Sequence, residues 1–224
     1  MLSMKKSFGY AFAAVATLVA GATTAQAQPR HLQPGSLLIY PFYDSSPGAG
    51  TIISVTNTNS DRTFCPNEDF RAGDVVLHYV YIDGATWREF DRFEPLTPGD
   101  TLSVLADSHN PEMDRGFLTV KALDPVTLDA IDFDYLIGDA IVVQSDFNFL
   151  WGYTPYSFRG LADDNTQQDC NRITTDDDQD GKADFDGTEY DMFPSELFVD
   201  SFLDRKSTRL NSSHSRASRM PSSA

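Results

Sequence analysis

The chain has 224 residues, and its 17 Lys and Arg against 33 Asp and Glu give a formal net charge of −16 at pH 7. An acidic chain without clustered Lys and Arg is poorly suited to nucleic acid or anionic lipid, because both are bound through their phosphates by basic side chains. We therefore expect no nucleic-acid partner, and any charged partner should be cationic.

The N-terminus has the pattern of a secretory signal peptide. Lys5 and Lys6 precede an apolar run over residues 8–20, which is shorter than the roughly 20 residues that cross a bilayer. Residues 25–27, Ala-Gln-Ala, then match the small-x-small pattern that a signal peptidase cleaves. The pattern predicts a signal peptide over residues 1–27, export to the periplasm, cell surface or medium, and no membrane span in the mature chain.

From residue 36 onward, short runs rich in Val, Ile, Phe and Tyr alternate with Gly, Pro, Asn and Asp, as in strands separated by turns. The predicted strands are residues 36–43, 51–58, 75–82, 86–93, 101–106, 116–123, 131–137 and 139–147. No window of helical length has an apolar stripe with caps, so helices should be few and short. The pattern predicts an all-β fold, a sandwich of two antiparallel sheets or a closed barrel. A soluble sandwich is preferred, because most strands are shorter than the roughly 9 to 11 residues of a membrane-spanning strand.

Turn residues and alternation refine this expectation. Asp83-Gly84 predicts a two-residue hairpin turn, and Pro98-Gly99 predicts a type II turn. After the hairpin turn, two sets of side chains alternate, as expected of a strand with one wet face. One set is Trp87, Glu89, Asp91 and Phe93, and the other is Arg88, Phe90 and Arg92. In residues 131–137, carboxylates alternate with apolar side chains, which predicts that Asp132 and Asp134 face water.

The two cysteines, Cys65 and Cys170, lie in polar, turn-rich segments of a chain that we expect to be exported. A disulfide between them is favoured over a catalytic or metal-bound thiol, because neither has a His or second Cys nearby in sequence. Such a bond would close a loop of about 100 residues and contribute roughly 4 to 5 kcal/mol in the chain-entropy account.

The strongest motif is the Asp-rich stretch at residues 174–190. Its spacing matches the calcium loops of EF-hand, dockerin and thrombospondin type 3 repeats, in which alternate carboxylates surround a hard cation. The candidate ligands are Asp176, Asp178, Asp180, Lys182 through its carbonyl, Asp184, Asp186 and Glu189. Loop position 12, where a bidentate Glu is expected, is Gly187, and Glu189 follows two residues late. Ca²⁺ bound weakly is one interpretation, and a solvated acidic loop leading into a hairpin is the other.

Other constellations are less specific. Exposed rings at Trp151, Tyr153 and Tyr156 would suit stacking on a sugar, although such residues more often pack in the core. His109 lies in a polar loop with Asp107 and Asp114, a first suspect for carboxylate-dependent hydrolysis, but the residue types there are ordinary turn formers. No common catalytic motif is present, which predicts a chain that is not an enzyme.

The C-terminal residues 204–224 differ in character from the rest. DRKSTRLNSSH (204–214) and SRMPSSA (218–224) resemble in-frame translations of a sequencing adapter, and residues 215–217 fit the index between its constant parts. We exclude this tail from functional argument and expect a natural chain that is cut short near residue 203. Residues 28–203 then form one domain, with 10 basic and 32 acidic residues and a net charge of about −22.

Three segments carry a weak family resemblance. PGSLLIYPFYDSSPG (34–48), the VYIDG hairpin (80–84) and FDYLIGDAIVV (133–143) resemble exported bacterial proteins with an immunoglobulin-like β-sandwich, over residues 35–202 at most. The resemblance implies a fold and no activity. The sequence therefore predicts an exported, non-catalytic structural or adhesive module with a protein or glycan partner, with a carbohydrate-binding module and a carboxylate-dependent hydrolase as alternatives.

Overall fold

The computed structural model describes residues 33–145, 149–161, 170, 173–176, 178, 180, 182–194, 196–197 and 218–219. The predicted signal peptide lies outside the described residues, as does the predicted tail apart from residues 218 and 219. Among the described residues, no helix is long and apolar enough to cross a membrane.

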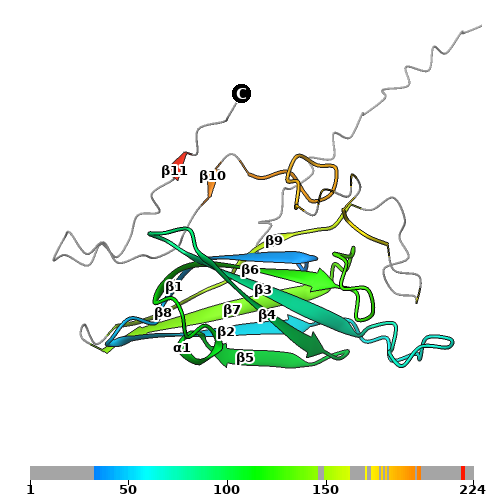
Figure 1. Cartoon of the computed structure of the whole chain (residues 1–224), viewed down its shortest axis with the longest axis horizontal. Helices are drawn as coiled ribbons and strands as arrows, with labels where there is room; N and C mark the ends of the chain where they lie inside the picture. Colours follow the sequence, from blue (N-terminus) through cyan, green and yellow to red (C-terminus); the bar gives the residue numbers. More distant parts are fainter. Residues whose placement is uncertain are drawn as a thin grey trace, which may run out of the picture.

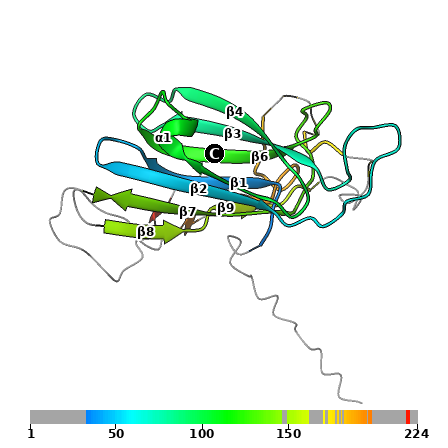
Figure 2. The same cartoon turned by 90° about the horizontal axis from the view of Figure 1, so that it is seen from below.

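Two antiparallel sheets pack face to face (Figures 1 and 2). The five-stranded sheet has the order β4-β3-β6-β1-β9, formed by β1 (Leu37–Asp44), β3 (Val75–Asp83), β4 (Glu89–Leu96), β6 (Arg115–Leu123) and β9 (Tyr156–Phe158). The four-stranded sheet has the order β5-β2-β7-β8, formed by β2 (Ala49–Asn57), β5 (Thr101–Leu105), β7 (Leu136–Gln144) and β8 (Phe149–Tyr153). The predicted all-β sandwich is confirmed.

The remaining elements are short. Helix α1 (Ala106–His109) has four residues and follows β5, so the prediction of few and short helices is confirmed. A separate two-residue pairing joins β10 (Glu196–Leu197) to β11 (Ser218–Arg219).

The core lies between the sheets and follows the period of two. The inward side chains of β3 are all at most 1% exposed; they are Val75, Leu77, Tyr79 and Tyr81. Those of β6 are also buried, and they are Leu118, Val120 and Ala122. Across the interface Ile53, Val55, Ala140 and Val142 complete the layer from β2 and β7. The alternation of apolar and polar residues in the sequence thus corresponds to burial of one face of these strands.

Strand β1 is buried on both faces. Leu38 and Tyr40 belong to the core between the sheets, whereas Leu37 and Ile39 belong to a second apolar cluster on the outer face of the five-stranded sheet. A run of consecutive apolar residues is the pattern of a strand covered on both sides. The outer cover comes from the Asp-rich segment, described below.

The β3–β4 hairpin has a longer loop than predicted. Residues 84–88 connect the strands, and the left-handed residue is Trp87, with φ of 60°, rather than the glycine. Asp83 shapes the loop, because its Oδ1 accepts hydrogen bonds from the N–H groups of Ala85 and Thr86 at 2.8 and 2.6 Å. These side-chain bonds replace the tight turn that the Asp-Gly dipeptide predicted.

The type II turn at Pro98-Gly99 is as predicted. Gly99 has φ of 81°, and the N–H of Asp100 donates to the carbonyl of Thr97 at 3.1 Å. A positive φ at the third turn residue is the defining requirement of type II.

Residues 131–137 do not form a strand of their own, so this prediction was wrong: residues 131–135 are irregular, and Leu136 and Ile137 already belong to β7. Within the stretch Ile131 makes a single bridge to Thr174, and β7 begins only at Leu136. Here the chain crosses from β6 in one sheet to β7 in the other, so it buries Ile131 and Phe133 without pairing along its length. Alternation alone does not separate such a crossover from a ladder.

A hydrogen bond joins the two sheets through the core. Tyr40 of β1 donates its hydroxyl to the carbonyl of Ser54 of β2 at 2.7 Å. Gly138 of β7 makes room for it, because a Cβ at this position would lie 2.0 Å from the Tyr40 hydroxyl oxygen. The glycine is therefore required by the approach of Tyr40.

We predict that Gly138→Ala lowers the free energy of unfolding by about 1 to 3 kcal/mol, because Tyr40 must leave its bond or its rotamer. Urea unfolding measures the change. Gly152→Ala on β8 is the matched control, since a Cβ there comes no closer than 3.4 Å to the Ala140 carbonyl. Adding Tyr40→Phe to Gly138→Ala should recover part of the loss, and equal losses in both alanine variants would contradict this account.

Candidate metal centre

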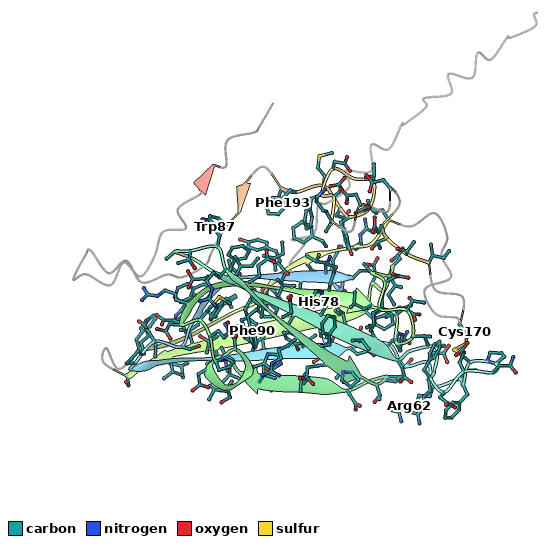
Figure 3. All side chains as sticks on the ribbon, viewed as in Figure 1. Arg62, His78, Trp87, Phe90, Cys170 and Phe193 are labelled. Carbon is teal, nitrogen blue, oxygen red and sulfur yellow. A yellow bond between two sulfur atoms is a disulfide. The ribbon has the colours of Figure 1, made fainter. Side chains whose placement is uncertain are left out.

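The Asp-rich segment packs on the outer face of the five-stranded sheet, over β1 and β9. Its apolar side chains form a second small core with those strands. The buried members are Leu37, Phe158 and Tyr190, and those packed around them are Ile39, Tyr156, Ala183, Phe185 and Phe193. The Phe158 ring centroid lies 4.9 Å from that of Phe185 and 5.3 Å from that of Phe193, which Figure 3 labels. Buried rings therefore fix the acidic segment on the sheet.

This packing brings together three of the predicted ligands. Carboxylate oxygens of Asp176, Asp178 and Glu189 lie within 4.8 Å of one another. Glu189, the residue two positions late for the motif, is only 3% exposed, and its Oε2 accepts the N–H of Asp184 at 2.9 Å. The N–H of Asp180 donates to Oδ1 of both Asp176 and Asp178 at 3.1 Å. Glu189 thus lies where it can replace the missing ligand of loop position 12.

The other predicted ligands have different surroundings. Asp180 forms an ion pair with Lys182, and this hydrogen bond lowers the pKa of Asp180. Asp186 accepts hydrogen bonds from the hydroxyl and N–H of Thr188, at 2.6 and 2.9 Å, and these bonds lower its pKa. Asp184 is exposed and contributes its main chain to the fold of the segment. These three carboxylates lie outside the close group of Asp176, Asp178 and Glu189.

A lysine that the sequence analysis missed faces this group. Burial lowers the pKa of Lys121 on β6, while the charges of Glu189 and Asp176 act in the opposite direction. Three carboxylates and one ammonium leave an excess of two negative charges. A divalent cation would neutralise that excess, and carboxylate and carbonyl oxygens are the ligands that Ca²⁺ prefers.

A disulfide anchors the entrance to the Asp-rich segment. Cys65 and Cys170 are bonded, with their Cα atoms 5.4 Å apart and 105 positions between them in sequence. Cys65 lies in the loop between β2 and β3 and is 3% exposed, and Cys170, labelled in Figure 3, precedes the acidic residues. The crosslink therefore ties the segment to the sandwich from a direction different from that of its aromatic contacts.

Beneath the segment lies a pair of acids that the sequence analysis placed on the surface. Asp132 is 6% exposed, and Asp134 is half-buried. The hydroxyl of Ser36 donates to Oδ1 of Asp134 at 2.8 Å and lies 3.5 Å from Oδ1 of Asp132. Asp134 Oδ1 also accepts the N–H of Gly160 at 2.9 Å. The expectation that both carboxylates face water was wrong. Both lie in the crossover between the sheets and contact Ser36, which is about one hundred positions away in sequence.

The pair has an electrostatic cost. Burial raises the pKa of Asp134 to about 7, and the charge of Asp132 adds to the rise, against the hydrogen bonds of Ser36 and Gly160. The unfolded chain releases this proton near the ordinary value of 3.8, whereas the folded chain retains it until about pH 7. The stability that Asp134 contributes is thus complete below about pH 4 and is lost as the pH rises through 7.

We predict that Asp134→Asn raises the melting temperature over wild type by a few degrees at pH 8 and by less at pH 5, because the amide stays neutral and its oxygen still accepts both hydrogen bonds. Thermal melts from pH 4 to 9 measure the difference. For Asp139→Asn, at an exposed position on β7, the difference in melting temperature from wild type should not change with pH. A constant difference between wild type and Asp134→Asn across this range would contradict the assignment.

The rings considered for sugar stacking take part in packing. Trp151 is 8% exposed, and its ring stacks on Phe42 at 6.0 Å, so the expectation of an exposed ring is not met there. Tyr153 is half-buried and donates its hydroxyl to the Phe42 carbonyl. Tyr156 is half-buried in the second core. In the described part of the chain the most exposed ring is that of Trp87, at 72%.

His109 points into the core rather than toward its acidic neighbours in sequence. Its ring is 9% exposed, and Nδ1 lies 2.8 Å from the Tyr81 hydroxyl. Burial lowers its pKa, an effect that Glu94 opposes from 3.5 Å. Asp107 and Asp114 are exposed. The three residues considered for hydrolysis therefore face different environments.

Comparisons with known proteins give little. No protein-family model and no curated protein matches the chain. The crystal structure of Thermotoga maritima 1070 is similar with a TM-score of 0.40 and 8% identity, over 55% of this chain and 95% of that chain. A similarity at this level carries no argument about function.

Proposed function

We propose that this chain is an exported, non-catalytic interaction module of the cell envelope or the extracellular space, stabilised by its disulfide and by a calcium ion in the Asp-rich segment. The observation that carries the proposal is the buried carboxylate of Glu189, held against Asp176 and Asp178 by a segment packed on the sheet. A structural ion there would secure the segment and the outer face of β1 together.

Export is supported by two independent features. The first is the basic, apolar and small-x-small pattern of residues 1–27. The second is the Cys65–Cys170 bond, because disulfides persist in oxidising compartments and are rare in the cytosol. Millimolar calcium is also typical of the extracellular space, where weak sites are occupied.

The polar residues that suggest catalysis have structural partners, which supports a non-catalytic role. His109 is bonded to Tyr81 in the interior. The half-buried acid Asp134 accepts hydrogen bonds from Ser36 and from the backbone of Gly160. Among the described residues, none of these groups forms a nucleophile and base pair, which acyl and glycosyl transfer require.

We predict that millimolar Ca²⁺ raises the melting temperature of the full chain. A tenfold excess over Kd contributes about 1.4 kcal/mol, or roughly 3 to 6 °C for a domain of this size. Differential scanning fluorimetry in Ca²⁺ and in EDTA measures the shift.

The matched variants are Asp176→Asn with Asp178→Asn, which keep the acceptors for the Asp180 N–H but remove two charges. They should abolish the calcium shift, whereas Asp186→Asn should preserve it, since Asp186 lies outside the close group. Identical melts of the wild-type chain in Ca²⁺ and EDTA would disprove the calcium site.

A non-catalytic module and a hydrolase differ in turnover. For the module that we propose, we expect no turnover of glycoside, ester or peptide substrates. Turnover that decreases in the Asp107→Asn or Asp114→Asn variant would refute a non-catalytic module. A substrate panel assayed with the wild-type chain and both variants distinguishes the module from the hydrolase. The carbohydrate-binding alternative predicts instead that the chain binds a neutral glycan.

A further inference from the structure

One row of side chains on β4 is exposed and has an unusual composition. Glu89, Asp91 and Phe93 alternate along the strand, and Trp87 precedes them in the β3–β4 loop; together they form what we call the β4 row. Trp87 is 72% and Phe93 50% exposed, and both carboxylates between them are exposed. β4 is an edge strand, with only β3 beside it among the described strands. An extended chain can therefore approach the row along an open edge.

The backbone of Trp87 is strained without a gain in burial. A bulky residue with a positive φ, here 60°, costs on the order of 1 to 3 kcal/mol, and glycine or asparagine would adopt it more readily. The Trp87 ring makes one edge-to-face contact, with Phe117 at 6.3 Å, and otherwise faces solvent. In Figure 3 it lies at the outer margin of the sheet, whereas Phe90 lies between the sheets. Strain that does not serve packing indicates a role in binding.

We infer that the β4 row is a docking strip for an extended polypeptide segment that carries lysine or arginine side chains. This inference rests on the proposed function, because it names the partner class of the interaction module. Two rings flank two carboxylates, so a cation can lie over the indole or phenyl face while a second pairs with Glu89 or Asp91.

Among the described residues, three basic side chains close to the row have other partners or surroundings. Arg88 is paired with Glu112 at 3.0 Å, and Arg92 donates to the carbonyl of His109 on the opposite face. Lys121 lies in the field of Glu189 and Asp176. The negative charge of the row is thus left for a partner.

His78 contacts two members of the row. Its Nε2 lies 3.0 Å from Oδ1 of Asp91, and its ring stacks on Phe93 at 4.4 Å with an angle of 4° between planes. Burial lowers the pKa of His78, and the hydrogen bond and charge of Asp91 oppose that shift. The Phe93 ring therefore has one face covered by the imidazole, and the side chain is still 50% exposed.

Charge complementarity favours a basic partner over the alternatives. A second copy of this acidic chain would bring carboxylates against carboxylates, and like charges at an interface are strongly unfavourable. A neutral glycan would use the rings but gains nothing from the net charge. A basic segment would contact the rings and pair with the carboxylates, and the negative electrostatic field of the whole protein would attract it.

The test is isothermal titration calorimetry of the full chain with a (Lys-Thr)8 peptide at about 20 mM salt, with (Glu-Thr)8 and a neutral β-linked hexose oligomer as comparison probes. We expect (Lys-Thr)8 alone to bind, and the binding to be lost at about 0.5 M salt. Glu89→Gln with Asp91→Asn should weaken it roughly tenfold. Asp107→Asn with Asp139→Asn removes the same charge from exposed positions elsewhere and should leave the affinity unchanged.

Trp87→Gly separates binding from stability. It relieves the positive φ, so its melting temperature should equal or exceed that of wild type while the affinity for (Lys-Thr)8 falls at least severalfold. A melting temperature that drops with unchanged affinity would assign Trp87 a structural role and overturn the strip.

Other outcomes would contradict either the cation strip or the interaction module. The β4 row is not a cation strip if (Lys-Thr)8 does not bind, if both double variants weaken its binding equally, or if the glycan binds instead. These results would not contradict the proposal of an interaction module. Substrate turnover in the panel above would instead remove the module itself.

Discussion

The two-sided burial of β1 is the constraint on which the rest of the structure depends. Its inner residues Leu38 and Tyr40 join the core between the sheets, and its outer residues Leu37 and Ile39 need a second cover. That cover is the Asp-rich segment, whose rings pack on β1 and β9. Because water must be excluded from both faces, a stretch that looks like a solvated acidic loop becomes part of the fold, and its carboxylates are brought to defined positions.

Burial also explains the electrostatics of this region. Glu189, Asp132 and Asp134 belong to segments that the sheet holds in place. Glu189 acts on Lys121 together with Asp176, whereas Asp132 and Asp134 act on Arg159. A chain with so few basic residues has three ways to tolerate this: hydrogen bonds to the carboxylates, a proton on Asp134, or a cation taken from solution. The first is present in the bonds of Ser36 and Gly160, the second is favoured by the raised pKa of Asp134, and the third is the basis of the calcium proposal.

The opposite edge of the same sheet shows the reverse arrangement. There the β4 row leaves rings and carboxylates open to solvent, and the left-handed backbone of Trp87 holds an indole where packing does not need one. One sheet thus has a face closed by the protein's own chain at β1 and β9 and an open, uncompensated acidic strip at β4. The closed face follows from apolar burial, whereas the open strip follows from the scarcity of basic side chains.

The sequence by itself determined the strands, because period-two burial is a local property: seven of the eight predicted strands correspond to observed ones, and the Pro98-Gly99 turn is correct. It also determined the calcium-type spacing of Asp176 and Asp178 and the pairing of two cysteines. Only the tertiary structure decided that residues 131–135 cross between the sheets, that Ser36 meets Asp134, and that Lys121 faces Glu189. These contacts join segments far apart in the chain, and no local pattern records which face of a crossover meets which strand.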